Sequence, residues 1–418
     1  MLTAYLLSAS ILTPVVGRLG DMFGKEHTLV AALVVLGAGT LLAALATDIK
    51  VLIVARVIQG AGGAIFPLSF GIIRDEFPRE RIPHGIALIS AILGIGGGLG
   101  IVLAGPIIDA FNIHWLFWFP LILIVVATVA AVIFVPESPI KTPGKINWAG
   151  AALLSAWLVA LLVGISEGSS WGWTDPRTLG LFAAAVVLLG AWVINEQRAA
   201  EPLVDMDMMR IRGVWTVNAA AFLIGAGMYS SFVLIPQFTE TDPSAGYGFG
   251  ASVTQAGLFL LPSTVMMLVV SPLAGRLSAR VGARVPLIAG SIATTLAFVL
   301  LAVAHDQEWE IYVASAILGI GIGLAFASLA NLIVEAVPPD QTGVATGMNT
   351  VMRSLGGSVG SQIGASVIAA TVVGSALPTE HGFEMAFIIA GAACLFGALA
   401  SLAVPRPRRA PVAVAVAA

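Results

Sequence analysis

The sequence predicts an all-α protein that crosses a membrane many times. Of its 418 residues, 58% are hydrophobic and only 10% are charged, and the mean hydropathy is +0.98. Soluble globular chains carry roughly 25% charged residues, so this chain has too little water-facing surface for that class. Its single cysteine, Cys394, lies within an apolar run, which excludes a disulfide framework and a thiolate metal site.

Long apolar runs separated by charged or turn-rich stretches define the expected helices. A bilayer core about 30 Å thick needs about 20 residues of helix. By that measure we expect about 13 transmembrane helices, near residues 2–19, 28–47, 51–73, 85–108, 113–135, 147–166, 179–195, 214–237, 252–274, 284–304, 311–334, 344–371 and 383–404.

The positive charges predict the orientation of these helices. If residues 17–27 face the cytoplasm, sixteen of the twenty Lys and Arg lie on that side, and only Lys50 and Arg177 lie outside. Cytoplasmic loops carry an excess of Lys and Arg. The C-terminus is therefore expected in the cytoplasm, and the N-terminus outside if the chain is complete as given. Arg56 and Arg353 fall within spans.

Two stretches of the chain repeat in order, which indicates a duplicated helix bundle. "GRLGDMFGKEH", from Gly17, recurs as "GRLSARVGARV", from Gly275, at an offset of 258. Gly85, Gly94 and Gly98 then share their spacing with a second glycine set at an offset of 262. Duplicated bundles are typical of transporters.

The residue types in the first of these stretches suggest structural roles. Its glycines at 17, 20 and 24 allow close backbone approach at a tight turn, and Asp21 can cap a helix N-terminus and pair with a cation. Arg74, at the cytoplasmic end of the third span, is the expected partner of Asp21. The stretch is not a phosphate-binding loop, because three residues separate its last two glycines and Glu26 follows Lys25.

These residues resemble the major facilitator superfamily, and the stretch "GRLGDMFGKEHTL" looks like its loop signature. The two extra spans, within 147–195, are similar to those of its fourteen-helix drug:proton antiporter branch. The resemblance implies a major facilitator fold of two pseudo-symmetric bundles. It also implies that the loop motif (Gly17, Arg18, Gly20, Asp21, Gly24, Lys25 and Arg74) holds the two halves together in the outward-facing state and releases them during rocking.

A second motif, "LIVARVIQGAGGAIFP", resembles the superfamily's proton-coupling segment. Arg56, Gln59 and Gly60 share one helix face in this stretch. A charge inside a span costs at least about 2.5 to 3.5 kcal/mol, so Arg56 is expected to face a cavity or partner. The alternative is that Arg56 snorkels to headgroups and that Gln59 is an ordinary interhelical hydrogen bonder.

A third motif, "GIGGGLGIVLAGP", resembles the glycine-rich fifth helix of antiporters. Leu99 stands where that family's pattern has proline, and the Gly-Pro pair follows at Gly105 and Pro106. Close helix packing explains Gly94 and Gly98 equally well.

The second half offers candidates for a substrate cavity. Arg353 lies about two turns inside its span, where it either lines a cavity or snorkels. The other candidates are polar residues at depth, which as a class more often join helices than bind ligands: Tyr5, Asn218, Tyr229, Asn331 and Gln362. Aromatic and methionine positions such as Phe222, Phe232 and Met266 are candidates for a pocket that takes a lipophilic cation or drug.

Proton antiport usually needs a buried carboxyl group, and none of the acidic residues lies near a span centre. In the branch that this chain resembles, the helix before "LTAYLLSAS" ordinarily carries such a residue. The loop motif follows only one span here. We therefore expect that the first helix lies outside the given sequence.

The expected domains are an N-terminal bundle (1–135, its first helix missing), a two-helix insertion with cytoplasmic linkers (136–213), a C-terminal six-helix bundle (214–405) and a cytoplasmic tail (406–418). The expected function is proton-coupled export of hydrophobic or amphipathic small molecules across the plasma membrane. The alternatives are a metabolite permease of the same fold and a truncated, non-transporting membrane protein. We expect a monomer that contacts lipid, substrate and protons, with no nucleic acid, cofactor, metal or enzymatic activity, since the five histidines are scattered.

Overall fold

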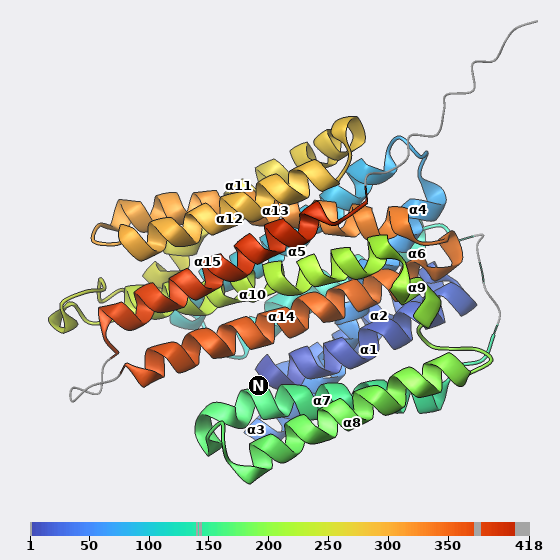
Figure 1. The fold of residues 1–418 in the computed structure, drawn as a ribbon, viewed down its shortest axis with the longest axis horizontal. Coiled ribbons are helices and arrows are strands. Elements are labelled where there is room, and N and C mark those ends of the chain that lie inside the picture. The colour runs from blue at the N-terminus through green and yellow to red at the C-terminus, as the bar shows by residue number, and fades with distance from the viewer. Residues whose placement is uncertain (1, 139–140, 142–143, 372–377, 406–418) are drawn as a thin grey trace, which may run out of the picture.

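The computed structural model describes residues 2–138, 141, 144–371 and 378–405, and it contains helices and no strand within those residues (Figure 1). The first six α-helices are α1 (Leu2–Phe23), α2 (Lys25–Ala44), α3 (Ile49–Gln59), α4 (Ile65–Glu76), α5 (Ile82–Ala110) and α6 (Trp115–Phe134). A hairpin follows, formed by α7 (Trp148–Trp171) and α8 (Pro176–Arg198), and then the short α9 (Met206–Arg210). The last six are α10 (Arg212–Glu240), α11 (Val253–Val281), α12 (Arg284–Val303), α13 (Glu308–Ala336), α14 (Thr342–Ala370) and α15 (Glu380–Leu402).

Ten stretches of the described chain are long and apolar enough to span a membrane, which confirms a polytopic membrane protein. They comprise the segment 49–76 and the helices α2, α6, α7, α8, α10, α11, α12, α13 and α15. Three further predicted spans coincide with α1, α5 and α14, which pack among the others. The exact number of 13 stays a prediction.

The loop motif is more helical than the sequence suggested. Residues 17–27 were expected to form a turn, but α1 runs to Phe23 and α2 begins at Lys25. The break is Gly24 alone, whose φ of 112° is unfavourable for residues with a Cβ. Its counterpart in the repeat, Gly282, has φ 87°. Both copies of the repeat therefore break between two helices at a glycine of positive φ, over one residue in the first copy and over two in the second.

The third predicted span is interrupted by a glycine-rich segment. Residues 60–64 (GAGGA) form a 3₁₀ turn between α3 and α4. A Cβ on Gly60 would come within 2.7 Å of the backbone nitrogen of Ala9 on α1. The missing side chain thus lets α1 lie directly against this turn, and Ser8 donates a hydrogen bond from its hydroxyl to the carbonyl of Val57 (2.5 Å).

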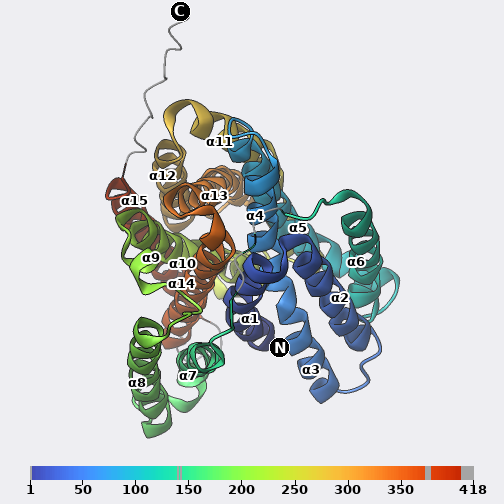
Figure 2. The same ribbon diagram turned by 90° about the vertical axis from the view of Figure 1, so that its right-hand side faces the viewer.

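The helices fall into two groups that meet along two seams (Figure 2). Helices α1 to α6 lie on one side and α10 to α15 on the other, with α1 beside α14 and α5 beside α11. The hairpin α7–α8 packs through α7 on both α1 and α14. We call the end of the bundle where α1 joins α2 the motif end; the sequence predicts that it is cytoplasmic.

Candidate functional site

The two halves approach closely at the motif end, where α1 crosses the start of α14. A Cβ built on Gly17 would lie 2.7 Å from the carbonyl oxygen of Gly343, and one on Gly343 would lie 2.7 Å from the carbonyl oxygen of Gly17. Real Cβ atoms do not tolerate backbone atoms this close. The seam at this point requires glycine on both helices.

Asp21 lies one turn further along α1 and caps α14. The backbone N–H groups of Gly343 and Val344 donate to its two carboxylate oxygens at 3.4 and 3.3 Å. These amides belong to the first turn of α14, which carries the positive end of the helix dipole. A carboxylate from the first half therefore stabilises a helix end in the second half.

Lys25 neutralises a pair of carboxylates beneath this contact. Its ammonium group is fully buried and lies 2.7 Å from Asp75 Oδ2 and 3.7 Å from Asp21 Oδ1. The hydroxyl of Ser138 also donates to Asp75. Gly71 leaves room for the lysine stem, since a Cβ there would fall 2.7 Å from Lys25 Cδ. Sequence reasoning missed Asp75; its spacing from a lysine on another helix gives no local signal.

The prediction that Arg74 pairs directly with Asp21 is wrong, because the hydrogen bonds of Arg74 go to other groups. Arg74 donates instead to the carbonyls of Val337 (2.7 Å) and Pro338 (3.2 Å) and to the hydroxyl of Thr342 (2.7 Å). These acceptors follow the C-terminus of α13, where a cation is favoured by the helix dipole. Arg74 thus forms a second link between the halves.

The remaining motif residues have separate surroundings. Gly20 faces Leu68 of α4, and a Cβ on Gly24 would meet the carboxylate of Glu137. The guanidinium of Arg18 lies beside Gly144, in the segment between α6 and α7.

Arg56 and Gln59 lie on one face, as their spacing predicts. Arg56 donates to Gln59 Oε1 (3.1 Å), and Gln59 Nε2 donates to the hydroxyl of Thr40 on α2 (2.9 Å). The guanidinium of Arg56 also lies 5.0 Å from the ring centroid of Phe117. This half-buried charge is held by neutral groups among the described residues.

Two tyrosines connect the predicted cavity residues of the first half with those of the second half. Tyr5 of α1 interacts electrostatically with Arg56 and with Tyr229 of α10. Tyr229 in turn lies near Arg353 of α14, and its ring packs against Gly357 on the same helix. Arg353 is only 8% exposed, and its guanidinium lies 4.4 Å from the ring centroid of Phe326. It is therefore buried between helices and does not snorkel.

The other polar candidates make separate hydrogen bonds. Asn218 accepts a hydrogen bond from Asn349 Nδ2 (2.9 Å), between α10 and α14. Asn331 donates to its own helix and to the carbonyl of Pro83 (3.5 Å), so it joins α13 to α5. Gln362 is half-buried near the far end of α14.

In the glycine-rich motif of α5, the close contact with the second half lies at Gly105, near the C-terminal end of the helix. A Cβ on Gly105 would lie 3.0 Å from the Cα of Thr254, so this glycine permits contact with α11. Pro106 is exposed. Gly94 and Gly98 lie within α5, but their surroundings lie outside the described part of the chain.

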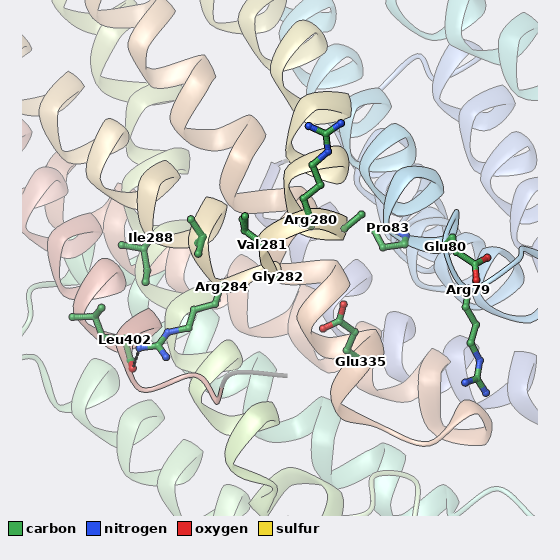
Figure 3. A pocket seen from close by; sticks show the side chains of 13 residues that line it. Arg79, Glu80, Pro83, Arg280, Val281, Gly282, Arg284, Ile288, Glu335 and Leu402 are labelled. Carbon is green, nitrogen blue, oxygen red and sulfur yellow. Dashed lines mark hydrogen bonds between the residues drawn. The ribbon is translucent and has the colours of Figure 1, made fainter. Parts of the chain in front are cut away.

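A cavity of about 580 Å³ opens at the motif end between the two halves (Figure 3). Arg79 and Pro83 line it from the α4–α5 side, and Arg284 and Glu335 from the second half. Figure 3 shows Arg284 directed at the carbonyl of Leu402, its hydrogen-bond acceptor.

The histidines lie in separate places, as expected, but two of them, His27 and His305, each lie beside two acidic residues. The donor atoms of Glu26, His27 and Glu137, and those of His305, Asp306 and Glu380, lie within 4.8 Å of one another in each set. His27 pairs with Glu137, and His305 with Glu380 (3.0 Å). The fold joins partners from distant segments, which spacing along the chain cannot reveal.

The sequence model of the Major Facilitator Superfamily matches residues 1–361. The chain belongs to the Major Facilitator Superfamily. Members of this superfamily are transporters, which agrees with two helix groups joined by breakable polar contacts.

Named relatives in this superfamily include drug exporters. The chain is 28% identical over 352 residues to the multidrug transporter protein MdtP of Bacillus subtilis, covering 82% of this chain and 63% of that protein. It is 28% identical to multidrug resistance protein 3 of Bacillus subtilis, covering 82% and 66%. It is 26% identical to the tetracenomycin C resistance and export protein of Streptomyces glaucescens, covering 82% and 63%. The chain thus spans 63 to 66% of the length of these relatives.

Solved structures share the fold. The human organic anion transporter MFSD10 superposes with a TM-score of 0.68 at 16% identity, covering 96% of this chain and 82% of that one. An auto-inhibited peptide transporter of the POT family gives 0.61 at 18% identity, covering 98% and 88%.

Proposed function

We propose that this chain exports hydrophobic or amphipathic small molecules across the plasma membrane by alternating access, driven by protons. The observation that carries the proposal is the seam at the motif end, where Asp21 of one half caps α14 of the other. A few hydrogen bonds and a close glycine approach form a closure that separates without unfolding either half.

Export is favoured over uptake of a metabolite by the printed names of the relatives, which describe multidrug and antibiotic exporters. The hairpin α7–α8 fits the two inserted helices of the fourteen-helix branch. The motif end, with its many arginines, then faces the cytoplasm, as does the C-terminal tail, and the protein works as a monomer.

Arg56 is our candidate for the proton-coupling machinery, together with Gln59. Its support is the burial of a guanidinium among neutral partners, since Gln59 and Phe117 are the neighbours that engage it among the described residues. A charge in this setting responds strongly to a proton or a charged substrate nearby.

Dye uptake into everted vesicles tests the proposal, because export moves substrate into their lumen. Vesicles carrying the full chain are given an acidic lumen, and accumulation of the neutral dye N-phenyl-1-naphthylamine from the medium is followed with and without a protonophore. We expect gradient-dependent transport that Asp21→Ala reduces about tenfold or more, because two hydrogen bonds between the halves are lost, each worth about 0.5–1.5 kcal/mol. Asp207→Ala, at a side chain that is 91% exposed, is the matched control. Transport that ignores the proton gradient would refute the coupling, and equal rates for Asp21→Ala and wild type would refute the role of the seam.

A further inference from the structure

The second half buries a positive charge that the described residues do not neutralise. Arg353 lies within α14, is 8% exposed, and has no Asp or Glu at ion-pair distance among the described residues. Its Nε–H is buried without a hydrogen-bond partner there. Its neighbours are the ring of Phe326 and the side chain of Tyr229. A buried guanidinium normally has an anionic partner, because desolvation without one is costly.

A second unpartnered donor belongs to the same pair of helices. Asn218 on α10 is 4% exposed, and its Oδ1 accepts from Asn349, which lies one turn before Arg353 on α14. The Nδ2 of Asn218 is buried without a partner in the described chain. Three side chains on this helix pair, those of Asn218, Arg353 and Ser366, hold a buried polar atom without a partner in the described chain. Two of these atoms, Arg353 Nε and Asn218 Nδ2, can only donate, so they complement a ligand that accepts hydrogen bonds.

Arg353 also lies near the interface between the two halves. Tyr229 lies between Arg353 and Tyr5 of α1, and Tyr5 interacts with Arg56 of the first half. The two charges within spans thus lie on either side of a pair of tyrosines, and both are positive. A lipophilic cation, which the aromatic and methionine pattern of the sequence favours, would be repelled by both.

We propose that Arg353 binds the anionic group of the transported molecule, and that the substrates are amphipathic organic anions with an aromatic or aliphatic body. The planar guanidinium suits carboxylate and sulfonate groups, which it binds through two parallel hydrogen bonds. The rings of Phe326 and Tyr229 offer apolar surface beside the charge for the body of the molecule. This substrate class rests on the transport function proposed above.

Binding of two matched dyes tests the proposal without requiring transport. 1-Anilinonaphthalene-8-sulfonate is an anion, and N-phenyl-1-naphthylamine is the same molecule without the sulfonate. Fluorescence titrations use the full chain in lipid nanodiscs, with empty nanodiscs subtracted. We expect Arg353→Gln to weaken binding of the anion at least tenfold, about 1.4 kcal/mol, and to change binding of the neutral dye by less than twofold. Arg353→Lys is expected to restore part of the affinity for the anion.

Arg177→Gln is the matched control, because Arg177 is 69% exposed and pairs with Asp175 outside the bundle. If Arg353→Gln does not fold, Asn218→Ala tests the second donor, with an expected threefold or greater loss for the anion alone. The proposal is overturned if these variants weaken both dyes equally, or if folded Arg353→Gln binds the anion as tightly as wild type. Anion-selective binding without efflux of either dye would support the site and refute the transport function.

Discussion

Replacing Gly17 with alanine places a methyl group in the tightest part of the seam between the halves. The new Cβ would lie 2.7 Å from the carbonyl oxygen and 2.9 Å from the carbonyl carbon of Gly343. Both are backbone atoms of the first turn of α14, so no side chain can rotate away. Helix α1 must therefore move away from α14, which lengthens the hydrogen bonds that Asp21 accepts.

The size of the effect follows from the cost of overpacking. Inserting a methyl group into a tightly packed site costs about 1–3 kcal/mol. The strain exists only while the motif end is closed, so this energy shifts the equilibrium toward the open state by about 5- to 150-fold. Gly180→Ala on α8 is the control, because a Cβ at Gly180 meets nothing within 4 Å.

Pulsed electron paramagnetic resonance measures this shift. Spin labels replace Phe23 at the end of α1 and Pro339 before α14, which are both exposed and belong to opposite halves. Cys394 is replaced by serine so that only these two sites are labelled. We expect the Gly17→Ala distance distribution to move toward longer distances and the Gly180→Ala distribution to match wild type. An unchanged distribution in folded Gly17→Ala would refute the idea that this contact holds the motif end closed.

Two stability predictions concern buried contacts within each half. Lys25→Met leaves two buried carboxylates without their cation, so we expect the free energy of unfolding to fall by about 3–5 kcal/mol. The control is Lys50→Met at an exposed position, which should cost less than about 0.5 kcal/mol. Denaturant titrations in detergent measure both values, and equal losses would contradict this reasoning. Gly356→Ala drives a methyl group into the backbone of Phe222 on α10, and we expect a loss of about 1–3 kcal/mol and a lower melting temperature. Gly190→Ala, in open space, should leave the melting temperature unchanged, and a Gly356→Ala protein as stable as wild type would show that α10 and α14 can separate freely.

The sequence predicted those features that depend on composition and local spacing. Apolar run length located the helices, and the period of the helix placed Arg56 beside Gln59. The repeat predicted two comparable halves, and Gly24 and Gly282 adopt the same unusual backbone conformation in both. Each of these results needs information from only one stretch of chain or from two similar stretches.

Contacts between distant helices could not be predicted in this way. The chain separates Lys25 from Asp75 by 50 residues and Arg74 from Val337 by 263, and many other charges were available at the motif end. Arg74 was expected to bind an aspartate because opposite charges attract. In the fold, two carbonyl groups that follow α13 and the hydroxyl of Thr342 accept from Arg74 at once, while Lys25 is close enough to neutralise Asp21. The partner is decided by packing, which a single sequence does not encode locally.

The two seams at the motif end are related by the repeat, yet only one carries a carboxylate. Gly275 meets the first turn of α5 much as Gly17 meets that of α14: a Cβ on Gly275 would lie 2.9 Å from the carbonyl oxygen of Pro83. Ala279 stands where the first copy has Asp21. The second helix position of α5 is Pro83, which has no N–H, whereas α14 presents free amides there. A carboxylate at position 279 would find fewer backbone N–H donors in the first turn of α5 than Asp21 finds in α14. The proline therefore explains why the second copy has no aspartate at this position. The α1–α14 seam thus couples closure of the motif end to Asp21, whereas the matching position of the α5–α11 seam offers packing alone.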